Sequence, residues 1–200
     1  MITHLRPALV MIVLMTVLTG LAYPLAMTGL AGAPFPRQAA GSFVERDGKI
    51  VGSSLIGQNS VGDAYFHSRP SATTTADPND SAKTVAAPYN AANSSGSNLA
   101  SSARALIDRA KEDVAKLKSE NPGIAVPADL VTTSGSGLDP DISPGAAPFQ
   151  AARVARARGV PEATAMALVA AHTQGRLLGI LGEPRVNVLA LNLALNDLRK

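Results

Sequence analysis

ALVMIVLMTVLTGLAYPLAMTGL, residues 8–30, decides the fold because it is apolar almost throughout. No charged residue occurs between Pro7 and Pro36. An α-helix rises about 1.5 Å per residue, so the stretch would reach roughly 35 Å and cross a hydrocarbon core of about 30 Å. A cleaved signal peptide is the alternative, since Ala31-Gly32-Ala33 resembles a cleavage site, but its apolar region usually covers only about 7 to 15 residues. Residues 8–30 are therefore predicted to form a transmembrane helix.

Charges on the two sides of this helix predict its orientation. Arg6 and His4 precede it, whereas Arg37 on the other side is soon followed by acidic residues. Cytoplasmic flanks tend to carry the excess of positive charge. Residues 1–7 are therefore predicted to be a short cytoplasmic N-terminus, and residues 37–200 an extracytoplasmic domain.

Small residues within the helix have a spacing that favours close packing of helices. Thr16 and Gly20 lie four residues apart, and small side chains let two backbones approach each other. The pair is a candidate contact with a partner helix. The alternative is that it reflects ordinary membrane-helix composition.

The composition excludes several classes of function. Hydrophobic residues make up 46% of the chain, aromatic residues 4% and charged residues 16%, so the core must rest on aliphatic side chains. The formal net charge is only +3, which predicts no nucleic-acid partner. Cysteine is absent, and His4, His67 and His172 lack a metal-ligand spacing. Neither a disulfide framework nor a metal site is therefore expected.

The outer domain begins with a β-hairpin signal. Asp47-Gly48 separates the short segments 42–45 and 49–51, and both turn residues tolerate the positive φ of a type I′ turn. Residues 71–102 then form a long stretch rich in Ser, Thr and Asn, without apolar periodicity. Little apolar burial is available there to offset the entropy of ordering. This stretch is expected to be either a disordered linker or an irregular ordered loop.

Helical periodicity dominates the second half of the chain. Apolar spacing and end signals predict helices over 102–120, 143–159, 160–175 and 187–198, with a short strand over 176–181. In the first helix Ser101 or Ser102 is the expected N-cap, and one apolar face is expected to be buried. Arg153, Arg156 and Arg158 would lie in solvent near the end of the second helix, where cations interact favourably with the helix dipole. The predicted fold class is α+β, richer in helix than in strand.

Ser134-Gly135-Ser136-Gly137 is the nearest approach to a chemical loop. Glycines can turn backbone N–H groups toward an anion, and a predicted helix begins shortly afterwards. The loop lacks the terminal lysine of a phosphate-binding P-loop. A tight turn that packs a strand against a helix is therefore the alternative to an anion site.

A membrane-tethered hydrolase that uses this loop is the alternative function. Its triad would be Ser136, His172 and Asp139. The residues around Ser136 do not match the nucleophile elbow of the common hydrolases, and no acid is evident that would orient His172.

Several strings of residues go further than composition. They are Gly52–Gln58 (GSSLIGQ), Tyr65–Ala72 (YFHSRPSA), Gly96–Leu99 (GSNL), Val126–Pro144 (VPADLVTTSGSGLDPDISP), Arg153–Gly159 (RVARARG) and Gly182–Leu195 (GEPRVNVLALNLAL). In this order and spacing they resemble KdpC, the C-subunit family of the bacterial Kdp potassium-transporting ATPase. The resemblance runs through the whole chain, including the N-terminal apolar helix.

The resemblance implies a non-catalytic accessory subunit that assembles and stabilises a high-affinity, ATP-driven potassium import complex in the bacterial inner membrane. The implied partners are a channel-like potassium-translocating subunit, a P-type ATPase subunit and membrane lipid. The family is described as a catalytic chaperone that raises the ATP affinity of the ATPase subunit. ATP is thus implied through the complex rather than as a bound cofactor, and potassium as the transported ion. Because ATP is cytoplasmic and the domain is expected outside, such an effect would travel through the membrane helices.

The sequence departs from the family pattern in one loop, where Ser95 and Ala100-Ser101 stand in place of glycine and Gly-Pro. An aromatic residue usual after Gln58 is also missing. No catalytic or metal-binding residue is predicted. The residues predicted to contact partner subunits are Thr16, Gly20, Tyr65, Phe66, Arg69, Asn98 and Asp139.

Overall fold

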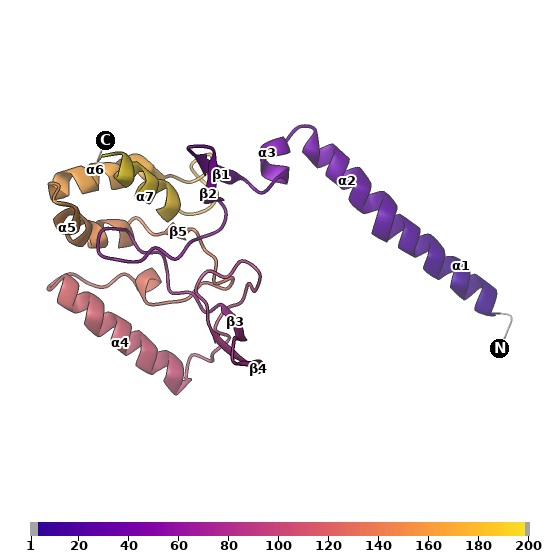
Figure 1. Cartoon of the computed structure of the whole chain (residues 1–200), viewed down its shortest axis with the longest axis horizontal. Helices are drawn as coiled ribbons and strands as arrows, with labels where there is room; N and C mark the ends of the chain where they lie inside the picture. The colour runs from indigo at the N-terminus through magenta and orange to yellow at the C-terminus, as the bar shows by residue number, and fades with distance from the viewer. Residues whose placement is uncertain (1–3, 199–200) are drawn as a thin grey trace. The chain divides into compact units, whose positions relative to one another are not determined.

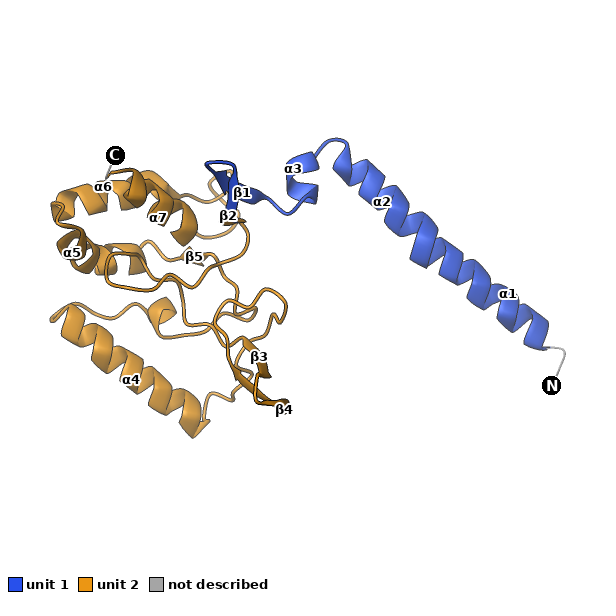
Figure 2. Cartoon of the chain, viewed as in Figure 1, with its two compact units in different colours: residues 1–51 blue, residues 52–200 orange. Residues whose placement is uncertain are grey.

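The computed structural model describes residues 4–198 (Figure 1). The chain divides into two compact units, Met1–Val51 and Gly52–Lys200, which Figure 2 shows in different colours. Helices are combined with small antiparallel sheets, as the predicted α+β class requires.

The first unit is dominated by one long apolar helix, Leu5–Gly32. It consists of α1 (Leu5–Met15), the π-helical segment η2 (Thr16–Ala22) and α2 (Tyr23–Gly32). Its mean hydropathy reaches 2.2, and it is long and apolar enough to cross a membrane, which fits a single-pass membrane protein. The helix predicted over 8–30 lies within it.

The π-helical segment lies just ahead of Pro24. Proline has no N–H to donate to the carbonyl four residues earlier, and its ring collides with that carbonyl. The wider turn, in which the Tyr23 N–H donates to Leu18 O five residues back, relieves this conflict. The Thr28 hydroxyl donates to Pro24 O at 2.8 Å, so this polar group is satisfied inside the apolar helix.

A β-hairpin follows the short helix α3 (Pro36–Ala39). Its strands are β1 (Phe43–Arg46) and β2 (Lys49–Ser53). Asp47 has a φ of 51° and Gly48 a φ of 73°, both positive as a type I′ turn requires. The hairpin predicted at these two residues is confirmed.

The core of the second unit lies between three helices and a three-stranded antiparallel sheet. The helices are α5 (Ala146–Arg158), α6 (Glu162–His172) and α7 (Val188–Asp197), and the strands, in sheet order, are β5 (Asp141–Ile142), β7 (Arg185–Asn187) and β6 (Thr173–Gln174). In the central strand Val186 pairs with Ile142 on one side and Thr173 on the other. Val154, Val186 and Leu191 are fully buried in one cluster, so helices and sheet share a single core.

Three predicted helices of this core are confirmed, and the predicted strand is wrong. Gly159 ends α5 with a φ of 67°, and the Asn187 side chain caps α7 by accepting a hydrogen bond from the Ala190 N–H at 3.0 Å. Residues 176–181, predicted as a strand, form a tight loop after β6. Strands of two or three residues leave no alternation in the sequence, which explains why the sheet was missed.

A second β-hairpin occupies part of the Ser/Thr/Asn-rich stretch. β3 (Thr74–Asp77) pairs antiparallel with β4 (Asp80–Ala86), which corrects the expectation of a loop or linker throughout 71–102. Every residue of β4 is at least partly exposed, so backbone pairing and polar side chains hold the hairpin rather than apolar burial. For example, the Asn90 Nδ2 donates to Thr74 O at 2.8 Å.

The helix α4 (Arg104–Glu120) confirms the first predicted helix but differs from it in two details. Ala103, not a serine, is its N-cap and makes no side-chain cap bond. Every residue of α4 is at least partly exposed, so the expected buried face is formed only in part, at Leu117, which packs against the core. The C-terminal end of α4 also contacts α5, since Glu120 Oε2 lies 3.3 Å from Arg153 Nε. Leu106 and Val114, nearer the N-terminal end than Leu117, line an open groove of about 610 Å³.

The role of Gly159 at the end of α5 can be tested by comparing it with a second glycine that also has open space around it. A side chain at either Gly159 or Gly175 would meet no atom within 4 Å, but only Gly159 has a positive φ, of 67°. We expect Gly159→Ala to lower the free energy of unfolding by about 1 kcal/mol, because the left-handed conformation strains an alanine. Gly175→Ala should leave it within about 0.5 kcal/mol. Denaturant titration of the two variants in mild detergent measures both values, and equal losses would contradict this assignment.

Candidate functional site

Two buried side-chain amides hold residues 63–69, a segment without helix or strand that passes through the core. The Phe66 N–H donates to Asn192 Oδ1 at 2.9 Å, and Asn192 Nδ2 donates to Phe66 O at 2.9 Å. In the same way the His67 N–H donates to Gln150 Oε1 at 2.8 Å, and Gln150 Nε2 donates to His67 O at 3.0 Å. Each amide thus pairs with one residue as a neighbouring strand would. Asn192 and Gln150 are both buried, and Phe66 is fully buried.

Two arginines of α5 hold the beginning of this segment. Arg153 donates to the carbonyls of Asp63 and Tyr65 at 2.8 and 3.1 Å, and Arg158 donates to Ala64 O at 2.7 Å. The Arg158 guanidinium also lies 4.7 Å from the centre of the Tyr65 ring, within the range of a cation–π contact. The expectation that both arginines lie in solvent is therefore wrong. Their guanidinium groups donate to backbone carbonyls that form no hydrogen bond with a neighbouring strand.

An ion pair holds the end of the segment. Arg69 Nη1 lies 3.0 Å from Asp139 Oδ2, and Arg69 Nη2 donates to Thr133 O at 3.3 Å. The Tyr89 hydroxyl donates to Arg69 O at 2.6 Å. Burial raises the pKa of Tyr89, so it stays a neutral donor. Arg69 and Asp139, two predicted partner contacts, thus contact each other inside the second unit.

The Ser134–Gly137 loop has the hydrogen bonds of a tight turn. The Gly137 N–H donates to Ser134 Oγ at 2.9 Å, and the Leu138 N–H donates to Ser136 Oγ at 3.1 Å. These two N–H groups point at hydroxyls of the loop itself and would not be available to an anion. The loop therefore fits the tight-turn alternative and does not fit a phosphate cradle.

The loop is also packed closely against the Ser/Thr/Asn-rich stretch. The Ser71 hydroxyl donates to Gly137 O at 2.7 Å. A Cβ at Gly137 would lie 2.6 Å from both Ser95 O and the Thr73 methyl group, and Gly137 has a φ of 67°. Only glycine fits this position. The long stretch is thus ordered by polar contacts with the turn.

The hydrolase triad is not assembled among the described residues. His172 Nδ1 lies 2.9 Å from Leu168 O of its own helix, and Asp139 is paired with Arg69. The hydroxyl of Ser136 accepts from Leu138 N–H and lies 3.4 Å from Ser134 Oγ. None of the three groups is hydrogen-bonded to another within residues 4–198. In the same range no cluster of His, Cys, Asp or Glu side chains is arranged to hold a metal ion.

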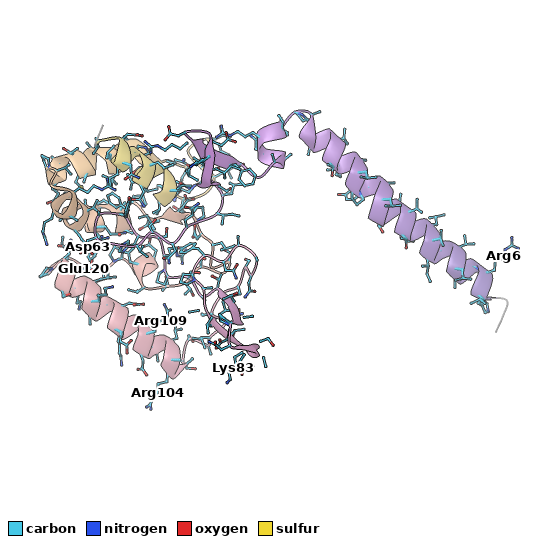
Figure 3. The ribbon with its side chains drawn as sticks, viewed as in Figure 1. Arg6, Asp63, Lys83, Arg104, Arg109 and Glu120 are labelled. Atoms are coloured by element: carbon cyan, nitrogen blue, oxygen red, sulfur yellow. The ribbon has the colours of Figure 1, made fainter. Side chains whose placement is uncertain are left out.

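A polar cleft of about 430 Å³ lies between the segment, α4 and α5. Asp113, Lys116 and Glu120 line it from α4, and Arg153 lines it from α5, with its Nε 3.3 Å from Glu120 Oε2 (Glu120 is labelled in Figure 3). His67 faces the same cleft. Burial, and secondarily the charge of Arg153, lowers the pKa of His67 below its usual value. The cleft contains both acidic and basic side chains. Its arginine, Arg153, already contacts two backbone carbonyls and the Glu120 carboxylate.

The predicted partner contacts lie in different surroundings. Thr16 and Gly20 share a face of the apolar helix, since a Cβ at Gly20 would lie 3.9 Å from the Thr16 methyl group. Phe66 is fully buried, and Tyr65 is half-buried under Arg158. Asn98 is exposed with a φ of 50°. Contact of any of these residues with a partner stays a prediction.

Sequence reasoning missed the residues that organise the site. Gln150 lies on the apolar face of α5 beside Ala147 and Val154, and Asn192 lies on that of α7 beside Leu191. A single polar residue on a predicted apolar face is the signal that indicates such a group. A buried amide has to find partners, because leaving it unpaired is costly.

Removing one amide tests this arrangement. Asn192→Ala leaves the buried N–H and C=O of Phe66 without their partner, and we expect a loss of about 2 to 4 kcal/mol in the free energy of unfolding. The matched change one turn later, Asn196→Ala, removes a partly buried partner of Arg158, which keeps the carbonyls of Ala64 and Leu195, and should cost at least about 1 kcal/mol less. Denaturant titration compares the two. Similar losses in the free energy of unfolding would show that the Phe66 pairing stabilises the fold no more than the Asn196 contact does.

Comparison with known proteins identifies the family. The KdpC family, described as the K⁺-transporting ATPase c chain, matches residues 5–197. The potassium-transporting ATPase KdpC subunit of Methylorubrum extorquens is 68% identical over 200 residues, which cover 100% of each chain. The KdpC subunit of Bradyrhizobium diazoefficiens is 67% identical over 196 residues, 98% of each chain, and that of Methylobacterium nodulans is 68% identical over 198 residues, 99% of this chain and 98% of the relative. The chain therefore belongs to the KdpC family, the C subunits of potassium-transporting ATPases.

Proposed function

We propose that this chain is the accessory, non-catalytic subunit of an ATP-driven potassium import complex. The observation that carries the proposal is the family match over residues 5–197, at 65–68% identity to relatives that are named as KdpC subunits. Potassium is then the ion that the complex transports. The single apolar helix Leu5–Gly32 supports a membrane-anchored subunit of such a complex.

The internal contacts of the second unit support a non-catalytic role. Ser136, His172 and Asp139 each make hydrogen bonds that serve the fold, and the sequence contains no Asp-Lys-Thr-Gly string of a phosphorylated ATPase. The chemistry of ATP cleavage and the ion path would therefore belong to partners. These are a P-type ATPase subunit and a channel-like potassium-translocating subunit.

The proposed topology has the N-terminus in the cytoplasm and residues 37–200 outside the bacterial inner membrane. It is supported by Arg6 on the inner side and by the mixed charges that follow Arg37 on the outer side. With this topology the Leu5–Gly32 helix is the direct covalent route by which the outer domain influences a cytoplasmic ATP site. A chaperone effect on ATP affinity is thus proposed as an allosteric one.

Recovery of partners tests the assembly. Mild detergent extraction of the tagged native chain should bring down two larger membrane proteins, and the eluate should hydrolyse ATP in a potassium-dependent manner. The matched control is a chain tagged identically whose residues 5–32 are replaced by an unrelated apolar span. We expect the control to recover less of both partners. Recovery of a lone native chain would refute the proposal.

Single cysteines test the topology, because the chain has none of its own. Glu45 is exposed on β1, and Arg6 is exposed at the N-terminal end of the apolar helix. A membrane-impermeant maleimide added to spheroplasts should label Glu45→Cys at once, and Arg6→Cys only after permeabilisation. The opposite pattern would reverse the orientation and bring the domain to the side of the nucleotide.

A further inference from the structure

The loop between β6 and β7 presents a group of aliphatic side chains to the surface. Residues 176–183 read Arg-Leu-Leu-Gly-Ile-Leu-Gly-Glu and are called the apolar loop below. The exposed fractions are 67% for Leu177, 83% for Leu178, 74% for Ile180 and 56% for Leu181. Isolated exposed leucines are ordinary, but four large aliphatic residues within five positions form a patch that marks an interaction site.

The apolar loop is fixed by its own hydrogen bonds. Arg176 Nη2 donates to both carboxylate oxygens of Glu183, at 2.9 and 2.7 Å, and this pair closes the base. The Leu177 N–H donates to Leu181 O at 2.9 Å, and the Leu181 N–H donates to Leu177 O at 3.0 Å. The loop therefore presents its side chains in a defined arrangement. Little conformational entropy would be lost when such a loop binds.

Leu178 combines exposure with backbone strain. Its φ is 54°, in the left-handed region that aliphatic residues rarely adopt. Neither feature stabilises the isolated chain, since the side chain stays in water and glycine would fit the backbone better. An exposed side chain on a strained backbone indicates a binding role, because it makes no stabilising contact within the chain and could make one with a partner.

Charges at the base indicate what kind of surface the loop fits. Arg176 is neutralised by Glu183, and Arg185 lies 3.0 Å from Asp141, so both cations near the loop are paired. A loop that inserts into an anionic bilayer surface usually has unpaired basic residues beside its apolar tip. A second copy is also a poor fit, because a twofold contact needs a self-complementary patch and a protruding tip requires a hollow. These features favour a protein pocket.

We propose that the apolar loop inserts into an apolar pocket with an uncharged rim on a partner subunit of the transport complex. Leu178 and Ile180, the two most exposed of its side chains, would fill the pocket. This inference rests on the proposed function, since it requires that the chain assembles with partner subunits. It adds which part of the second unit makes the contact.

Photo-crosslinking tests where the loop lies. A photoreactive amino acid replaces Ile180 in the tagged chain, and a control carries it at Leu55, which is 64% exposed elsewhere in the same unit. Illumination of the detergent-extracted complex, with lipid retained, should join position 180 to one partner subunit at a yield at least about fivefold above that of position 55. Crosslinks chiefly to lipid, to a second copy or equally from both positions would overturn the proposal.

A double variant separates binding from folding. Leu178→Gly with Ile180→Ser should reduce recovery of the partners at least about tenfold, as expected for a central contact, while the control Leu55→Ser changes it less than about twofold. The unfolding midpoint of the isolated variant should be unchanged or higher, because glycine relieves the strain at Leu178. A lowered midpoint, or full recovery of partners, would contradict the inference. If the native chain itself recovers no partner, the proposed function fails first, and that result is distinct.

Discussion

The backbone of Phe66 and His67 crosses the core of the second unit without belonging to a sheet. Four polar backbone groups on these residues have to be satisfied away from water, and an unpaired group in such a place is costly. The amides of Asn192 and Gln150 satisfy all four, at distances from 2.8 to 3.0 Å. Arginines hold both ends of the fixed segment, and Ser71 just beyond it binds the Ser134–Gly137 turn. The serine hydroxyl groups of this turn, which the sequence offered as candidate functional groups, are thus hydrogen-bonded within the fold.

The sequence predicted those elements whose signal is local. The apolar helix follows from hydropathy, the first hairpin from Asp47-Gly48, and α7 from its leucine spacing. The three-stranded sheet was missed because its strands are too short for any alternation, and β3 and β4 because their pairing depends on polar contacts. The network around Phe66 joins residues far apart in the sequence: Gln150 lies 83 positions from His67, and Asn192 lies 126 positions from Phe66. No local pattern encodes such pairings.

The predicted burial of α4 is confirmed only at Leu117, and it fails elsewhere for a different reason. Its apolar spacing is real, but spacing alone cannot tell a face that packs in the isolated chain from one that stays open. Other apolar residues of α4 line an open groove, and those of the loop after β6 are exposed. The apolar periodicity of a sequence predicts which face of a helix is apolar, and it does not predict what covers that face.

The internal contacts of the second unit bear on how an effect on ATP could arise. If this chain raises the ATP affinity of a partner tenfold, it must bind the ATP-loaded state of that partner more tightly than the empty state by about 1.4 kcal/mol. By reciprocity, ATP must tighten the binding of this chain by the same factor. A rearrangement of the core would break the buried amide pairings and the arginine contacts, and leaving such groups unpaired is costly. The difference must therefore arise at surfaces that contact the partner, either along the apolar helix or at exposed apolar groups, and not from a rearrangement of the core.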